Sequence, residues 1–209
     1  KKNNLITADK KDSQGLCFVG KIRLPEFLQQ KLKKKTGDII EIPSNSKVFK
    51  FNNQGNQSLL NELSRKYKFS KTDGNVIGEH NGAYYYTIGQ RKGLAIGGYD
   101  EPIFVIGIDT KSNNIFVGKG KNHPGLIKKA IKIEIATINW VNDSYNIDLI
   151  KTLKIKARIR YRQPLQDVIL HIYGKKLYVE FKKYQTAVTS GQFLALYHKN
   201  ELIASSVIP

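Results

Sequence analysis

One residue of this 209-residue chain, its only cysteine, has a clear capacity for covalent chemistry. Cys17 lies in a short apolar run between the cations of Lys10–Lys11 and of Lys21–Arg23, and Gly15 and Gly20 flank it. Nearby cations lower the pKa of a thiol and stabilise a thiolate or a persulfide, so this setting favours a reactive sulfur. A lone cysteine in an apolar run is nevertheless more often an inert small hydrophobe, by about two to one on composition alone. The residues alone leave both interpretations open.

The segment from Lys154 to Gln163 is the best candidate for binding nucleic acid. A strand places every second side chain on one face. One face would then carry Lys154, Lys156, Arg158, Arg160 and Arg162, and the other Ile155, Ala157, Ile159 and Tyr161. Like charges in register repel one another unless something neutralises them. A row of phosphate contacts is therefore favoured over a merely solvated sheet face.

A glycine-rich loop runs from Gly89 to Gly98 and carries Arg91 and Lys92. Backbone amides together with two cations suit a phosphate group. However, the loop has neither the P-loop pattern nor a following helix. A tight turn that needs glycine for its backbone explains the loop at least as well.

Composition points to a polyanionic partner. Lys plus Arg number 35 against 17 Asp plus Glu, which gives a net charge of +18, and nucleic acid is the first candidate. The basic residues are spread through alternating segments without a long amphipathic helix, which argues against a membrane surface.

The four histidines are scattered and show no metal-ligand spacing, so no metal site is expected. One cysteine and the lack of a spanning or signal-like apolar run predict a cytoplasmic protein.

The elements that must position these residues are mostly strands. A helix is predicted from Pro25 to about Lys35, and a strand from Asp38 to Ile42. Residues 44–74 are polar and are expected to be a solvated insertion with a short helical pattern at Leu59, Leu60, Leu63 and Tyr67. A turn at Asn81–Gly82 precedes a β-rich Ala83–Thr87. Further strands are predicted at 103–108, 115–117, 131–140, 153–162, 168–173, 177–181, 193–197 and 202–207, a spacing typical of an antiparallel sandwich or small barrel.

Three segments together resemble the tRNA-specific 2-thiouridylase family. They are Lys10–Gly20, then Gly78–Gly82 with Tyr86–Leu94, and finally Arg158–Gln163. The blocks are long, are spaced as in the family, and span nearly the whole chain. Their combination is far more specific than any single motif.

The resemblance implies a function that composition does not show. Family members use ATP, with magnesium, to thiolate carbon 2 of the wobble uridine in the tRNAs for Lys, Glu and Gln. Cys17 matches the cysteine that carries the sulfur as a persulfide, received from a sulfur-carrier protein. Arg160, Tyr161 and Gln192 match positions that contact tRNA, although strand-end and turn packing would also explain them.

The resemblance also implies a domain organisation. The fold class is expected to be mainly β with minor α: a small mixed central domain over residues 18–100, then an antiparallel six-stranded-type β-barrel over 101–209. Residues 1–17 would be the tail of an ATP-pyrophosphatase domain whose nucleotide loop and second cysteine are absent from this sequence, so that the fragment alone should be inactive. The main alternative is a non-catalytic RNA-binding β-barrel with a structural cysteine. A cysteine hydrolase with His80 as its base ranks last.

Overall fold

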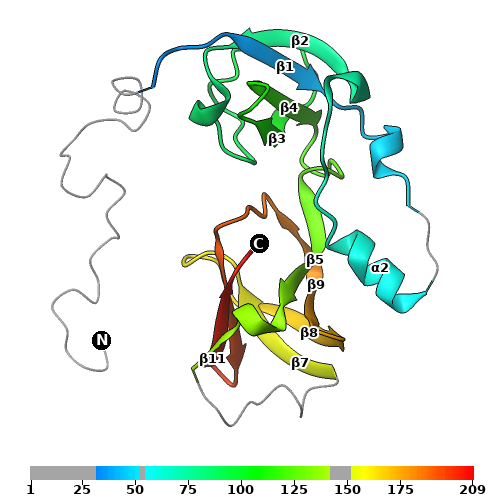
Figure 1. Ribbon diagram of the computed structural model, residues 1–209, viewed down its shortest axis with the longest axis vertical. Helices are drawn as coiled ribbons and strands as arrows, with labels where there is room; N and C mark the ends of the chain where they lie inside the picture. Colours follow the sequence, from blue (N-terminus) through cyan, green and yellow to red (C-terminus); the bar gives the residue numbers. More distant parts are fainter. Residues whose placement is uncertain (1–31, 52–54, 142–151) are drawn as a thin grey trace, which may run out of the picture. The chain divides into compact units, whose positions relative to one another are not determined.

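Two β-sheets form most of the part of the chain that the structure describes (Figure 1). The computed structural model describes residues 32–51, 55–141 and 152–209, of which those from Thr36 onward belong to one compact unit. Cys17 and most of the helix predicted from Pro25 lie outside the described residues. The described end of that helix, Leu32–Lys35, is not helical, so the prediction is wrong over these residues.

The first sheet has four strands in the order β2-β1-β4-β3. These are β1 (Gly37–Glu41), β2 (Asn75–His80), β3 (Ile103–Asp109) and β4 (Asn114–Lys119). β1 pairs antiparallel with β2 and parallel with β4, and β3 and β4 form an antiparallel pair. The strand predicted at Asp38–Ile42 is confirmed as β1, whereas β2 was not predicted.

β1 is a central strand that is buried on both faces. Ile39 packs with Val105 and Ile115 in one apolar cluster, and Ile40 packs with Ile106 and Phe116 in another. Neither isoleucine side chain is exposed to solvent. Successive strand residues point to opposite faces, so a short apolar run can join two cores.

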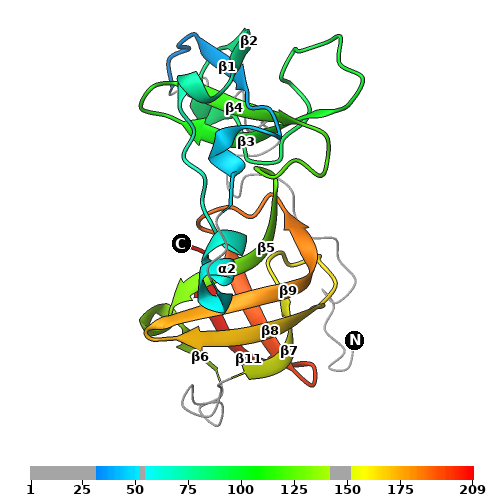
Figure 2. The ribbon, with the colours of Figure 1, turned by 90° about the vertical axis from the view of Figure 1, so that its right-hand side faces the viewer.

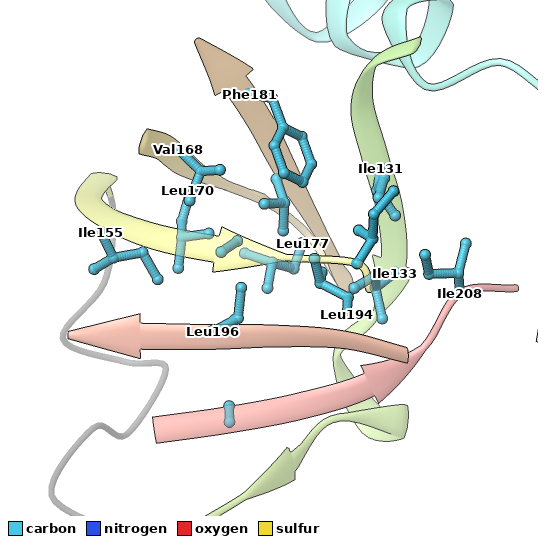
Figure 3. Packing of buried hydrophobic residues seen from close by; sticks show 14 of the residues in the cluster. Ile131, Ile133, Ile155, Val168, Leu170, Leu177, Phe181, Leu194, Leu196 and Ile208 are labelled. Carbon is cyan, nitrogen blue, oxygen red and sulfur yellow. The ribbon is translucent and has the colours of Figure 1, made fainter. Parts of the chain in front are cut away.

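The second sheet has seven antiparallel strands in the order β5-β9-β8-β7-β10-β11-β6. They are β5 (Ile127–Glu134), β6 (Asn139–Trp140), β7 (Thr152–Arg158), β8 (Gln166–Tyr173), β9 (Lys176–Thr186), β10 (Phe193–His198) and β11 (Glu201–Val207). The sheet curls around one apolar core, in which Leu170, Phe181 and Leu194 point toward one another (Figure 3). The predicted fold class, mainly β with a barrel-like C-terminal sheet, is confirmed.

One α-helix, α2 (Asn56–Leu63), lies beside β5 and β9 in the described part of the chain (Figure 2). Its Leu60 is buried, and the hydroxyl of the fully buried Tyr178 donates a hydrogen bond of 2.7 Å to Asn61 Oδ1. The predicted helical pattern is thus confirmed for its leucines, while Tyr67 lies beyond the helix end. Single 3₁₀ turns occur at Lys47–Phe49, Lys71–Asp73, Ala83–Tyr85 and Ile135–Thr137.

The segment predicted to be a solvated excursion, residues 44–74, packs against both sheets instead: α2 lies beside β5, and aromatic residues on either side of it reach the first sheet. The ring of Phe49 lies 4.8 Å from that of Tyr67 and 5.9 Å from that of Phe69, and Phe69 lies 5.5 Å from Phe116, centroid to centroid. A few aromatic residues in a polar stretch supply this contact, because each buries a large apolar area. The average composition of residues 44–74 is polar, so it does not indicate the packing of these few aromatic residues.

Two predicted strands have different conformations. Ala83–Tyr85 is a 3₁₀ turn, because Gly82 adopts a φ of 144° and the Tyr85 N–H bonds its carbonyl at 3.1 Å. The strand predicted at 131–140 ends at Glu134, and a 3₁₀ turn separates it from β6. β4 pairs with β1, and β3 pairs with β4, so one sheet contains strands from both sides of residue 101.

Candidate nucleic-acid interface

The turn between β7 and β8 presents an aromatic ring to solvent. β7 ends at Arg158, and the buried Ile159 then donates its N–H to Gln163 Oε1 at 3.0 Å. The chain turns there, since the Gln163 N–H bonds the Arg160 carbonyl at 3.1 Å. Tyr161 is therefore 76% exposed, and the prediction that it shares the apolar face of the strand is wrong. Ile155, Ala157 and Ile159 do share that buried face.

Arg158 holds this turn against β10. Its guanidinium donates to the Tyr161 carbonyl at 3.0 Å and to the Tyr197 hydroxyl at 2.7 Å. It also lies 5.7 Å from the centroid of the Tyr161 ring and 5.1 Å from that of Tyr197. A guanidinium can stack on aromatic faces while donating hydrogen bonds in its own plane. Arg158 therefore organises the site and is less free than its place in the basic row suggested.

Arg160 reaches the segment that follows β9. One guanidinium nitrogen, Nη2, donates to the carbonyl oxygens of Thr186 and Ala187, at 2.7 and 2.8 Å. Arginine has five N–H donors, and among the described residues those of Nε and Nη1 form no hydrogen bond, while the side chain is exposed. The arrangement fixes the guanidinium and leaves it able to bind an anion.

Gln192 organises the turn before β10. Its Oε1 accepts the Thr189 N–H at 3.2 Å, and its carbonyl accepts the Ile208 N–H at 2.7 Å. The side chain is half-buried, and in the part of the chain that the structure describes its amide nitrogen has no hydrogen-bond partner. That nitrogen is the group of Gln192 that can donate to a ligand.

Three motifs that are distant in sequence converge at Ala187. Its carbonyl accepts from Arg160, its N–H bonds the Leu126 carbonyl at 2.9 Å, and its φ is 51°. The glycine-rich loop meets it from another side, because a Cβ on Gly89 would lie 2.4 Å from the Ala187 Cβ. The turn of Gln192 starts two residues further on. Nothing in the sequence marks Ala187, since its importance comes from a backbone conformation.

The glycine-rich loop uses its first amides internally. The Gly89 N–H bonds the Val105 carbonyl at 2.7 Å, and the Gln90 N–H bonds the Thr87 carbonyl at 3.0 Å. Gln90 Oε1 accepts the Thr87 N–H at 3.1 Å in return. The Gly89 and Gln90 amides are already hydrogen-bonded and cannot hold a phosphate, which favours the interpretation of the loop as a tight turn. The side chains of Arg91 and Lys92 remain exposed.

His80, from the same motif region, has a structural role. Its Nδ1 accepts the Gly82 N–H at 2.9 Å, and burial lowers the pKa of its imidazole. Only 4% of the residue is exposed. Because its Nδ1 lone pair is engaged in the turn, His80 is a poor general base.

The basic row along β7 is partly neutralised within the protein. Lys156 pairs with Asp167 at 2.8 Å, and this hydrogen bond and charge lower the pKa of the Asp167 carboxyl. Lys154 and Lys156 border a hollow of about 670 Å³ that Lys129, Lys182 and Tyr197 also line. The like-charge repulsion expected from the sequence is thus relieved by a carboxylate on the neighbouring strand.

The described residues contain neither a metal-ligand cluster nor a membrane-spanning helix. Within residues 32–51, 55–141 and 152–209, no three His, Cys, Asp or Glu side chains come together as a metal site. None of the helices described in these ranges is long and apolar enough to span a membrane. Cys17 and its neighbouring cations lie outside them.

The fold and the site define a two-sheet β protein with a cationic and aromatic face. Comparison with known proteins narrows this class. A family model described as a tRNA methyl transferase PRC-barrel domain matches residues 59–119, and one described as an aminomethyltransferase beta-barrel domain matches residues 130–208.

Curated relatives match almost the entire chain. It is 50% identical to a tRNA-specific 2-thiouridylase MnmA of Christiangramia forsetii, over 98% of the chain and 53% of that protein. Identity is 48% to the protein of the same name from Flavobacterium johnsoniae (98% and 52%) and 35% to that from Pseudomonas aeruginosa (99% and 47%). The chain spans about half the length of these relatives. It belongs to the tRNA-specific 2-thiouridylase family, of which it has the central and C-terminal domains.

The contact between Gly89 and Ala187 can be tested by substitution. Gly89→Ala adds a Cβ at 2.4 Å from another Cβ and at a φ of 85°. We expect it to lower the free energy of unfolding by about 2 kcal/mol, from a left-handed backbone and overpacking together. Urea unfolding of the chain measures the loss.

Gly97→Ala is the matched control in the same loop. A Cβ at Gly97 has no neighbouring atom within 4 Å, and its φ is not positive. Its effect should stay within about 0.5 kcal/mol. Equal stabilities of the two variants would contradict the close approach.

Proposed function

We propose that the chain supplies the tRNA-binding face of a sulfurtransferase that thiolates carbon 2 of the wobble uridine of tRNA. The reaction is ATP-dependent, takes place in the cytoplasm and acts on the tRNAs for Lys, Glu and Gln. ATP, with magnesium, is the co-substrate of the catalytic domain that family members carry ahead of this region. The support is family membership together with relatives that are named tRNA-specific 2-thiouridylases.

Cys17 carries the transferred sulfur in this proposal. A sulfur-carrier protein delivers the sulfur, and Cys17 holds it as a persulfide before it passes to the base. Residues 1–17 are then the tail of the catalytic domain, with a central domain at 18–100 and a tRNA-binding barrel at 101–209. The cations on both sides of Cys17 support this role, because they stabilise a sulfur anion.

A single observation carries the tRNA-binding part of the proposal: the exposed Tyr161 ring, which Arg158 holds outward beside Arg160. Single-stranded loops of RNA are recognised by stacking of unpaired bases on aromatic rings, with cations on the backbone phosphates. An anticodon loop offers both groups. Gln192 adds one amide donor from the neighbouring turn.

Substitutions in this turn should separate stacking from charge. Tyr161→Ala should weaken tRNA binding about 5- to 150-fold, which corresponds to one lost base stack. Tyr161→Phe, the matched control, keeps the ring and should retain nearly full affinity. Arg160→Ala should weaken binding to all tRNAs and reduce the slope of log affinity against log salt by about 0.7–0.9.

Fluorescence anisotropy of labelled tRNA at several salt concentrations measures both effects. Circular dichroism shows whether each variant is folded. Salt-independent binding by the wild-type chain, or unchanged affinity of Tyr161→Ala, would contradict the assignment of this turn to tRNA.

The role of Cys17 requires the full-length protein. Cys17→Ser should abolish thiolation, because an alcohol cannot hold a persulfide, while tRNA binding persists. Mass spectrometry of the tRNA nucleosides provides the measurement. Normal thiolation by the variant would contradict a catalytic role for Cys17. It would favour the alternative function, an RNA-binding barrel with a structural cysteine.

A further inference from the structure

The hollow of about 670 Å³ lies on the outer face of the second sheet. Strands β7, β8 and β9 lie side by side (Figure 2), and on their inner face Ile155, Val168 and Phe181 pair across the strands and point into the apolar core (Figure 3). Side chains alternate between the two faces of a sheet, so the neighbours of these three residues face away from the core. Those neighbours line the hollow.

The floor of the hollow is apolar. Ile169 of β8 lies in its middle, because its backbone pairs with Lys154 of β7 on one side and with Glu180 of β9 on the other, and all three residues line the hollow. Tyr197 of β10, which pairs with Lys156 of β7, adjoins them. Ile169 and Tyr197 are both half-buried. Ligand sites commonly combine such a concave apolar surface with a few polar groups.

Lysine side chains supply most of the polar groups around this floor. The charged lining consists of five lysines and two carboxylates, namely Lys129, Lys154, Lys156, Lys182 and Lys199, with Asp167 and Glu180. Lys129 Nζ donates to the Lys182 carbonyl at 2.6 Å. Three exposed ammonium groups, those of Lys154, Lys182 and Lys199, form no hydrogen bond and no ion pair within the described ranges 32–51, 55–141 and 152–209. We call these three residues the rim lysines.

Both carboxylates of the hollow already have a partner inside the protein. Asp167 pairs with Lys156 at 2.8 Å, and Glu180 Oε2 lies 2.9 Å from His171 Nε2, which does not line the hollow. Neither carboxylate therefore forms an ion pair with a rim lysine. The hollow has an excess of positive charge that an external anion can neutralise.

The hollow is joined to the site around Tyr161 by a shared cation. Arg158 lies 5.1 Å from the centroid of the Tyr197 ring, which lines the hollow, and 5.7 Å from that of Tyr161. At another border, Lys129 of the hollow lies 5.2 Å from the centroid of the Tyr184 ring, which is 59% exposed. Exposed aromatic rings thus flank the hollow at two of its borders.

A single strand of RNA suits this arrangement better than an acidic protein segment. Proteins bind single strands with a positively charged groove that follows the backbone and with aromatic rings on which bases stack. A ribose-phosphate unit offers a charge for the rim lysines and a carbon face for the floor. An acidic protein segment would use the charge and leave the exposed rings without a base.

We infer that the hollow binds the ribose-phosphate backbone of a single-stranded RNA segment, beside the nucleotide whose base stacks on Tyr161. The rim lysines bind phosphates, and Ile169 packs against a ribose. The inference rests on the proposed function and deepens it, since it gives the path of the strand. From the β7–β8 turn, the strand crosses the outer face of β7, β8 and β9 toward Tyr184.

Substitutions of rim lysines in the full 209-residue chain provide the first test. Lys154→Gln and Lys182→Gln should each weaken tRNA binding about three- to tenfold near 0.1 M salt and lower the salt slope by about 0.7–0.9. Lys175→Gln is the matched control, because exposed Lys175 lies in the β8–β9 turn and does not line the hollow. Its affinity and slope should equal those of the wild type, and circular dichroism shows whether each variant is folded.

Acetylation of lysines, located by mass spectrometry, provides the second test. Bound tRNA should slow the acetylation of Lys154 and Lys182 in the wild-type chain and leave that of Lys175 unchanged. Equal acetylation of Lys154 and Lys182 with and without bound tRNA would overturn the inference. Protection of both by polyglutamate but not by tRNA would also overturn it, and would assign the hollow to an acidic protein segment.

The outcomes separate the inference from the proposed function. If Tyr161→Ala weakens tRNA binding while Lys154→Gln and Lys182→Gln keep the wild-type affinity and slope, the inference is overturned and the proposed function stands. If the wild-type chain does not bind tRNA, both are overturned.

Discussion

The close approach of Gly89 to Ala187 is the contact on which the arrangement of the candidate site depends. It joins the loop that precedes β3 to the segment that follows β9, and so ties the two sheets together where the charged side chains gather. Ala187 adopts a left-handed conformation, which costs a non-glycine residue about 1–2 kcal/mol. Hydrogen bonds from Arg160 and to Leu126 hold it there and offset the cost.

The charges of the protein fall into two groups with different roles. Lys156 and Arg158 are engaged by Asp167 and by Tyr197, so they stabilise the sheet as much as they present charge. Arg160 keeps donors that form no hydrogen bond among the residues described here. The net charge of +18 favours a polyanionic partner, and the internal partners of each cation indicate which cations are available to it.

Most strands of the second sheet were predictable from the sequence, because alternation and turn residues are local signals, whereas β2 was not predicted. Ile155, Ala157 and Ile159 alternate as predicted and are buried together. Alternation fails at Tyr161, since the strand ends where Gln163 Oε1 accepts a hydrogen bond from the Ile159 N–H. The resemblance named Tyr161 and Arg160, but the exposure of the ring and the two carbonyl contacts of the guanidinium follow only from the fold. The convergence at Ala187 joins distant segments, which no local pattern reports.

Ultraviolet crosslinking of tRNA to the chain, with the crosslinked residues located by mass spectrometry, tests the central claim most directly. A base stacked on Tyr161 should form the main crosslink, and tRNA in excess should compete it away. Crosslinks at Tyr173 with none at Tyr161 would contradict the account, because Tyr173 is the last residue of β8, at the end of that strand opposite to the β7–β8 turn.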